Sequence, residues 1–260
     1  MPFAKRSLGQ NFLCDPNTAR RIVAALDIGP QDTVLEIGPG RGALTEWIAA
    51  AKPARFLALE KDRDLAPVLA ERFPGLEVLT ADALEHPWES VDSPHYKVVG
   101  NLPYNVASPL IWDFVSRASD YGRAVFMVQH EVALRLTADH GGRAYGALTA
   151  WVRSFADTEY LFKVGPNVFR PRPKVDSAVV QFRPRSDRPE TDLSRALSEL
   201  LHRCFQMRRK QMSNILKSQW ESGVGQWFEQ RGLAPSCRPE NLSPQDFLDL
   251  SAFMKFHFFS

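Results

Sequence analysis

The chain has 260 residues, 44% of them hydrophobic and 24% charged, which is typical of a soluble globular protein with one large domain or a domain and a smaller partner. No apolar stretch approaches the roughly 18 residues of a transmembrane helix, and residues 1–13 lack the apolar core of a signal peptide, so we expect a cytoplasmic protein with no membrane partner. The formal net charge is +2, but residues 163–217 carry 13 Lys and Arg against 5 Asp and Glu, which indicates either a solvated face or a surface that binds a polyanion.

Short aliphatic runs alternate with helical segments through the first half of the chain. The predicted buried strands are residues 33–38, 56–60, 76–80, 96–101 and 124–129. Residues 43–51 and 64–73 lie between the first three strands and have helical spacing of apolar side chains, with Pro67 in the first turn of the second helix. This alternation predicts an α/β fold with a doubly wound, Rossmann-like sheet.

The pattern changes after Gln129. Residues 158–164 and 177–184 resemble two strands joined by a proline-rich segment, so we expect an antiparallel pair at the sheet edge. From about Leu193 the periodicity is helical, and the last helix is predicted to have Ser243 as N-cap, Pro244 at its first position and Asp246 at its third. We therefore predict one domain over residues 1–186 and a small all-helical domain over residues 187–260.

The cysteine and histidine pattern predicts neither disulfides nor a metal site. The three cysteines are Cys14, Cys204 and Cys237. They are far apart, with no C-x-x-C pair, and we expect buried reduced thiols. His130 and Glu131 begin like the zinc motif H-E-x-x-H, but Leu134 stands where the second histidine would be.

A glycine-rich turn follows the first predicted strand, in the segment LEIGPGRGALTE. Glycines let the backbone approach a ligand closely, and the N-terminus of the next helix offers unpaired N–H groups. The spacing of Gly38, Gly40 and Gly42 departs from the dinucleotide pattern G-x-G-x-x-G. A tight turn without a ligand therefore remains an alternative.

An acidic residue lies at or near each of the first three strand ends. Glu60 ends the second strand, where a carboxylate can accept hydrogen bonds from the ribose of a nicotinamide cofactor or of S-adenosylmethionine (SAM). Asp82 follows the third strand and could bind the exocyclic amine of an adenine, with helix capping as the alternative role. Glu36 precedes the glycines, where a carboxylate suits a cationic ligand better than a pyrophosphate. Together the three favour SAM.

The fourth predicted strand delivers Asn101-Leu102-Pro103-Tyr104 to the same edge of the sheet. An exocyclic amine on a base is a poor nucleophile because its lone pair is delocalised into the ring. The side-chain carbonyl of Asn101 and a backbone carbonyl aimed by Pro103 could accept both N–H bonds and favour the tetrahedral amine of the transition state. The ring of Tyr104 offers a stacking face, worth on the order of 1–3 kcal/mol. The structural alternative is an Asn-Pro turn with a partly buried tyrosine.

These motifs resemble the ribosomal RNA adenine dimethylase family, whose members use SAM to transfer two methyl groups to one adenine N6. The similar stretches follow the family order over nearly the whole chain: residues 7–13, 35–45, 59–65, 81–84, 100–105, 168–180 and 204–216. The resemblance implies a SAM-dependent methyltransferase domain over residues 1–186 and an RNA-binding helical domain over residues 187–260.

The resemblance also implies roles for individual residues. The implied SAM contacts are Asn11, Leu13, Gly38, Gly40, Glu60, Asp82 and Asn101. Asn11 and Leu13 lie in a segment that local sequence alone would assign a structural role. The implied catalytic residues are Asn101, Pro103, Tyr104 and Phe169. Phe169 is a candidate second stacking face opposite Tyr104, with a place in the core as its alternative role.

The resemblance is strongest to the branch that dimethylates two adjacent adenosines near the 3′ end of small-subunit (16S) rRNA during ribosome biogenesis. We therefore expect a monomer that acts on this RNA within a pre-30S particle. Arg208, Arg209 and Lys210 are consecutive, and on a helix they would fan out across an arc suited to phosphate contacts. Arg170, Arg172 and Lys174 flank the expected adenine pocket.

Three other functions remain as alternatives. One is a large-subunit rRNA adenine N6-methyltransferase of the macrolide-resistance type, and another is a mainly non-catalytic small-subunit assembly factor. An oxidoreductase would share the glycines and Glu60, but it would leave Asp82 and the Asn101–Tyr104 segment unexplained.

Overall fold

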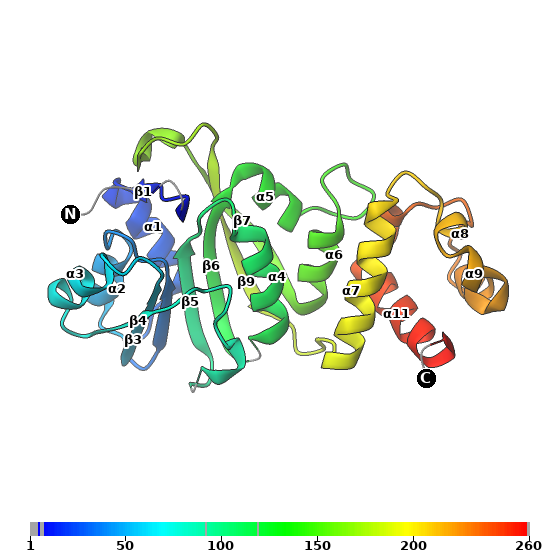
Figure 1. Ribbon diagram of the computed structural model, residues 1–260, viewed down its shortest axis with the longest axis horizontal. Helices are drawn as coiled ribbons and strands as arrows, with labels where there is room; N and C mark the ends of the chain where they lie inside the picture. Colours follow the sequence, from blue (N-terminus) through cyan, green and yellow to red (C-terminus); the bar gives the residue numbers. More distant parts are fainter. Residues whose placement is uncertain (1–4, 6–7, 92, 119, 259–260) are drawn as a thin grey trace. The chain divides into compact units, whose positions relative to one another are not determined.

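A seven-stranded sheet forms the centre of the fold in the computed structural model, which describes residue 5 and residues 8–91, 93–118 and 120–258 (Figure 1). The strand order is β4-β3-β2-β5-β6-β9-β7. The strands are β2 (Thr33–Ile37), β3 (Arg55–Glu60), β4 (Leu76–Thr80), β5 (Tyr96–Asn101), β6 (Tyr121–Gln129), β7 (Ala156–Val164) and β9 (Ser177–Pro184). The predicted Rossmann-like α/β fold is confirmed, and each of the five predicted central strands is present.

The first five strands of this sheet run parallel, and β9 is antiparallel to β6. Every residue of β2 is buried, as expected for a strand covered on both faces of a parallel sheet. The two strands predicted after Gln129 are also neighbours, with β7 at the edge of the sheet beside β9. The order places β5 next to β2, so the chain crosses from one half of the sheet to the other at this point.

Helices cover the sheet in the first part of the chain. They are α1 (Pro16–Leu26), α2 (Thr45–Ala51), α3 (Ala66–Arg72), α4 (Ala107–Arg117) and α5 (His130–Leu136). Helix α1 packs on β5, β6 and α2, and α3 packs on β4 (Figure 1). Helix α1 was not among the predicted helices, although its start carries a recognisable signal: Asp15 accepts a hydrogen bond from the Thr18 N–H at 2.7 Å, and Pro16 is the first helical residue.

A small two-stranded sheet holds the N-terminal segment against a much later part of the chain. Strand β1 (Phe12–Leu13) pairs antiparallel with β8 (Phe169–Arg170), so that Leu13 lies opposite Phe169. The Cys14 N–H extends this pairing by donating to the carbonyl of Val168 at 2.8 Å. Sequence periodicity could not predict strands of two residues.

The chain divides into two compact units. One runs up to Leu134 and includes Asp157–Pro184, and the other comprises Arg135–Ala156 and the chain from Arg185 onward. The second unit thus holds α6 (Ala147–Phe155) as well as the C-terminal helices. Those helices are α7 (Thr191–Gln206), α8 (Met212–Ile215), α9 (Lys217–Gln219), α10 (Gly225–Gln230) and α11 (Pro244–Phe258). Within this unit α6, α7 and α11 pack on one another.

The helical conformation expected for Arg208, Arg209 and Lys210 is wrong. Helix α7 ends at Gln206, and residues 207–210 form a turn that the Lys210 N–H closes onto the carbonyl of Met207 at 2.8 Å. A regular helix resumes only at Met212. Arg208, Arg209 and Lys210 therefore lie in a turn, and the helical arc expected for them is absent.

The three cysteines are free thiols, but they differ in burial. Cys204 is buried and Cys237 is partly buried, whereas Cys14 is exposed just after β1, so the expectation of buried thiols is wrong for Cys14. None of the helices in the described part of the chain combines the length and the hydrophobicity needed to span a bilayer.

The start of α11 supplies a test of the local energetics. The N–H and hydroxyl of Ser243 both bond the Asp246 carboxylate, at 2.8 and 2.7 Å, and the Asp246 N–H donates back to the Ser243 hydroxyl at 3.1 Å, which confirms the predicted cap. We expect Ser243→Ala to lower the free energy of unfolding by about 1 kcal/mol, because it leaves the Asp246 N–H without its side-chain acceptor and removes the hydroxyl bond to the Asp246 carboxylate. Urea unfolding followed by circular dichroism measures this. Ser218→Ala, at an exposed position, is the control. If both substitutions lowered the free energy of unfolding equally, the cap would not be what stabilises the helix.

Candidate active site

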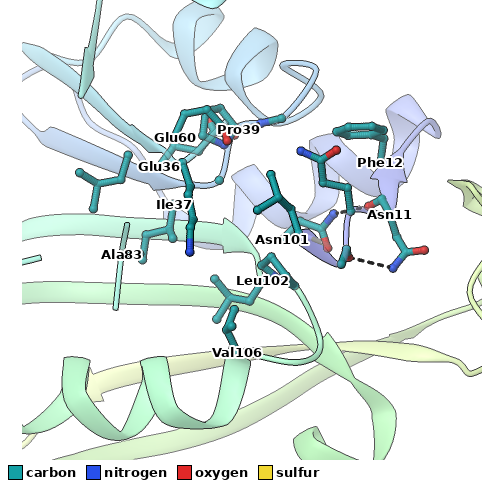
Figure 2. Close-up of a pocket in the computed structure, with 18 of the residues that line it drawn as sticks. Asn11, Phe12, Glu36, Ile37, Pro39, Glu60, Ala83, Asn101, Leu102 and Val106 are labelled. Carbon is teal, nitrogen blue, oxygen red and sulfur yellow. Dashed lines mark hydrogen bonds between the residues drawn. The ribbon is translucent and has the colours of Figure 1, made fainter. Parts of the chain in front are cut away.

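A pocket opens where the carboxyl ends of β2, β3 and β5 meet (Figure 2). In an open parallel sheet this is the place where ligands bind, because the chain leaves neighbouring strands in opposite directions at the switch in strand order. The pocket gathers residues from several predicted motifs: Asn11, Leu13, Glu36, Gly38, Gly40, Glu60, Asp82, Asn101, Pro103 and Tyr104. All of the proposed SAM contacts and catalytic residues line it except Phe169.

The glycine turn after β2 forms one wall of the pocket. Gly38 and Gly42 adopt left-handed conformations, with φ of +66° and +83°. A Cβ atom on Gly38 would meet nothing within 4 Å, so this glycine faces open space, whereas one on Gly42 would lie 2.9 Å from the Phe73 ring. Gly38 therefore keeps the pocket open for a ligand, and Gly42 lets α3 pack closely against the turn.

Two buried carboxyl groups lie beside this turn (Figure 2). Glu36 accepts a hydrogen bond from the Thr45 hydroxyl at 2.7 Å, and burial raises the pKa of Glu36 to about 8. Glu60 accepts the N–H groups of Gly40 and Asp62 at 3.0 and 2.8 Å, and burial also raises the pKa of Glu60. Neither carboxyl group has a cationic partner among the ion pairs of the described residues. Their arrangement favours a ligand that brings its own positive charge.

Asp82 lies at the rim of the pocket, in a turn after β4. One of its carboxylate oxygens pairs with the Lys61 ammonium at 2.5 Å, and the other accepts the Leu84 N–H at 3.1 Å. The capping role considered for Asp82 is thus realised on a turn instead of a helix. The Lys61 partner keeps this carboxylate ionised, which suits it to accept a hydrogen bond from an amine.

Asn101 ends β5 with its side chain fixed by the N-terminal segment. Its amide nitrogen donates to the backbone carbonyl of Asn11 at 3.0 Å (Figure 2). This bond assigns the nitrogen to the protein and leaves the Oδ1 atom as the acceptor available to a ligand. Asn11, which sequence reasoning alone treats as structural, therefore sets the direction of Asn101.

The segment that carries Asn11 is itself anchored beside the pocket. The Lys5 ammonium lies 2.6 Å from a carboxylate oxygen of Asp62, and the side-chain amide of Gln10 donates to the other oxygen at 3.0 Å. Sequence reasoning missed Lys5, Gln10 and Asp62 because a segment that folds back over a site has no periodic signal. The available clues were that Gln10 lies in the family-like stretch over residues 7–13 and Asp62 in the one over residues 59–65.

Pro103 and Tyr104 connect the end of β5 to α4. The carbonyl of Pro103 accepts the N–H groups of Val106 and Ala107 at 3.1 and 3.0 Å, so it is engaged in the first turn of the helix. The Tyr104 hydroxyl lies 2.6 Å from the hydroxyl of Ser177. Burial raises the pKa of Tyr104, so its hydroxyl is protonated near neutral pH.

Phe169 is fully buried in the hydrophobic core and does not line the pocket. The structure thus shows the core position that the sequence analysis named as its alternative. The stacking role of Phe169 stays a prediction.

The six basic residues proposed to contact RNA differ in their surroundings. Arg170, Arg172 and Lys174 are exposed in β8 and the loop after it. Arg208 is engaged within the second unit: it pairs with Glu240 at 2.7 Å and donates to the carbonyl of Arg143 at 2.9 Å. The last two residues, Arg209 and Lys210, are exposed.

Among the described residues, no group of three His, Cys, Asp or Glu side chains is placed to hold a metal ion.

The chain is similar to proteins of one family over almost its full length. Residues 2–255 match the family model described as ribosomal RNA adenine dimethylase. The chain is 51% identical to the ribosomal RNA small subunit methyltransferase A of Nitratidesulfovibrio vulgaris (strain DP4), over 96% of both chains. It is 49% identical to the protein of that name from Maridesulfovibrio salexigens, over 97% of this chain and 96% of the relative.

Solved structures agree with this assignment. A dimethyladenosine transferase from Plasmodium falciparum matches 95% of this chain and 98% of its own with a TM-score of 0.76 and 26% identity. The 23S rRNA methyltransferase ErmE matches 93% of this chain and 98% of its own with a TM-score of 0.73 and 27% identity. The family match, the methyltransferase fold and the pocket agree, and the chain belongs to the ribosomal RNA adenine dimethylase family.

Proposed function

We propose that the chain uses SAM to dimethylate N6 of two adjacent adenosines near the 3′ end of small-subunit rRNA, as a step in small-subunit biogenesis. The observation that carries the proposal is the side chain of Asn101, whose nitrogen is held by the Asn11 carbonyl so that its oxygen is left for a ligand. The relatives at 49–51% identity are named small subunit methyltransferases, whereas the large-subunit enzyme ErmE is 27% identical. This difference favours the small subunit over the large-subunit alternative.

The pocket fits SAM. Gly38 leaves open space beside the turn, and the buried Glu60 is placed at the end of β3, where a carboxylate accepts bonds from ribose hydroxyls. Glu36 and Glu60 provide two buried carboxyl groups for a ligand that is positively charged at its sulfonium and amino groups. We assign the remaining contacts to Asn11, Leu13, Gly40, Asp82 and Asn101, which line the same pocket. SAM, when bound, supplies an electrophilic methyl group there.

The end of β5 positions the target amine. The Asn101 oxygen accepts one N6–H bond, and the second acceptor is the carbonyl of Leu102, because the Pro103 carbonyl already accepts the N–H groups of Val106 and Ala107. Two acceptors in these places hold the lone pair toward the methyl donor and stabilise the tetrahedral amine that forms. Tyr104 stacks on the adenine ring. No strong general base is needed, since the methylated amine loses its proton to water after transfer.

Exposed basic residues of both units are proposed to bind RNA. In the first unit these are Arg170, Arg172 and Lys174, and in the second they are Arg209 and Lys210. Arg208 is also proposed to contact RNA, and its guanidinium in addition pairs with Glu240 and donates to the carbonyl of Arg143. We accordingly propose catalysis for residues 1–186 and RNA binding for residues 187–260. The chain acts as a monomer in the cytoplasm, on a pre-30S particle.

The test of the function is methyl incorporation from labelled SAM into unmethylated small-subunit particles and into large-subunit RNA. The expected product is N6,N6-dimethyladenosine at two adjacent positions of the small-subunit RNA. Label confined to large-subunit RNA would contradict the proposal in favour of the macrolide-resistance type. Binding to the particles without methylation would favour a non-catalytic assembly factor.

Replacing Asn101 tests the catalytic assignment. We expect Asn101→Ala to lower kcat by roughly 10²–10³, the range seen when a preorganised hydrogen-bonding group is removed from a transition state. Single-turnover methylation of small-subunit particles measures this, with Asn214→Ala as a control at an exposed position. Methylation at the wild-type rate in Asn101→Ala would show that this side chain does not act on the amine.

The exposed residues of the turn after α7 are expected to bind phosphate. Arg209→Ala and Lys210→Ala should each weaken RNA binding and reduce the slope of log K against log [salt] by about 1, while SAM affinity is retained. Arg208→Ala should chiefly lower the melting temperature, because it breaks the Glu240 ion pair. Filter binding at several salt concentrations distinguishes these effects, with the exposed Arg20→Ala as control. Unchanged RNA affinity and salt slope in Arg209→Ala and Lys210→Ala would remove the turn from the RNA surface.

The raised pKa of Glu36 predicts a pH effect on SAM binding. With a native pKa of about 8 against an ordinary value of 4.5, the protonated form persists in the folded protein, and stability declines as pH rises between these values. A cationic ligand favours the ionised carboxylate and so lowers its pKa. SAM binding near pH 7 should therefore release a proton and become tighter as pH rises toward 8. Calorimetry in buffers of different ionisation enthalpy measures the release, which Glu36→Gln should reduce; no proton release in the wild type would show that Glu36 does not sense the ligand's charge.

A further inference from the structure

We propose that Ser177 is a positioning residue for the target adenine, acting through the ring of Tyr104, and that this role matters most for the second methyl transfer. The inference rests on the proposed function, since it concerns how the adenine is held during that reaction. Ser177 lies within the family-like stretch over residues 168–180, but no role was assigned to it there, and it does not line the pocket.

The hydroxyl of Ser177 is a fixed point in the fold. Ser177 is completely buried and is the first residue of β9, where it pairs in register with Gln129 of β6. The residue before it is also held, since the Asp176 carbonyl accepts the His130 N–H at 2.9 Å. The Ser177 side chain thus belongs to the sheet itself, although it reaches the loop after a different strand.

Tyr104 depends on this fixed point for its orientation. Its backbone is set by Pro103 and by the first turn of α4, but these contacts leave the ring free to rotate about its own side-chain bonds. The hydroxyl at the far end of the ring lies 2.6 Å from the Ser177 hydroxyl, which ties down the other end. A ring held at both ends presents one constant face to the pocket that it lines.

The chemistry of the two methyl transfers explains why the second transfer depends more strongly on a fixed Tyr104 ring. Before the first transfer the N6 amine has two N–H groups, one for the Asn101 oxygen and one for the Leu102 carbonyl. After it the amine has one N–H and a methyl group, so only one of those hydrogen bonds can hold it. Stacking on Tyr104 then provides a larger share of the alignment between the nitrogen lone pair and the methyl donor.

Ser177→Ala tests the proposal through the product distribution. We expect the ratio of dimethyl- to monomethyladenosine at a fixed time to fall about fivefold, as expected for the loss of one ordinary hydrogen bond, with SAM affinity unchanged. Ser154→Ala is a matched control, because Ser154 is also a buried serine with a hydrogen-bonded hydroxyl, in the second unit. An unchanged product ratio in Ser177→Ala would overturn the proposal.

Tyr104→Phe removes the same hydrogen bond from the other side and keeps the ring. If the bond acts as proposed, Tyr104→Phe, Ser177→Ala and the double variant all show the same reduced ratio. Independent effects that multiply in the double variant would overturn it. The comparison also distinguishes loss of the hydrogen bond from a folding defect in Ser177→Ala, because Tyr104→Phe removes the same bond and leaves the buried serine in place.

A binding measurement separates this proposal from the function on which it rests. In RNA that carries 2-aminopurine in place of the target adenosine, stacking on Tyr104 should quench the fluorescence of the 2-aminopurine. The quenching should be weaker in the complex with Ser177→Ala. Equal quenching by both proteins would overturn the positioning role. Failure of the wild-type protein to methylate small-subunit particles would overturn the proposed function instead, and the quenching would still report on the ring.

Discussion

The placement of β5 beside β2 in a parallel sheet is the constraint on which the site depends. Because parallel strands end at the same edge, this order brings Asn101 to the place where Glu36 and Glu60 already lie. The carboxyl groups can then face a cationic methyl donor while the amide faces the amine that receives the methyl group. Neither half of the sheet holds both sets of groups, and the switch in strand order joins them.

The N-terminal segment completes what the sheet begins. A side-chain amide at a strand end has two possible orientations, and only one presents its oxygen to an amine. The Asn11 carbonyl selects that orientation, and the ion pair between Lys5 and Asp62 helps to keep the segment in place. The same logic applies to Tyr104, whose ring is held by Ser177 of β9. The side chains proposed to act on the substrate thus lie on one edge of the sheet, but residues distant in the sequence fix their directions.

The sequence predicted the parts of this protein that follow a local pattern. Aliphatic runs marked the five central strands, and the Ser243–Asp246 cap was correct to the residue. Contacts between distant segments were not predictable, because no spacing rule links Asn11 to Asn101 or Ser177 to Tyr104.

The error at residues 208–210 also concerns contacts that the local sequence does not show. Composition alone did not show that residues 207–210 would form a turn, or that Arg208 would form an ion pair with Glu240.

A crystal structure of this protein with SAM is the most direct test of the proposed site. It should show the ribose hydroxyls at Glu60 and the methyl group directed toward the Asn101 oxygen, with the Asn11 bond intact. A nucleoside bound outside this pocket, or an Asn101 side chain turned so that its nitrogen faces the methyl group, would contradict it.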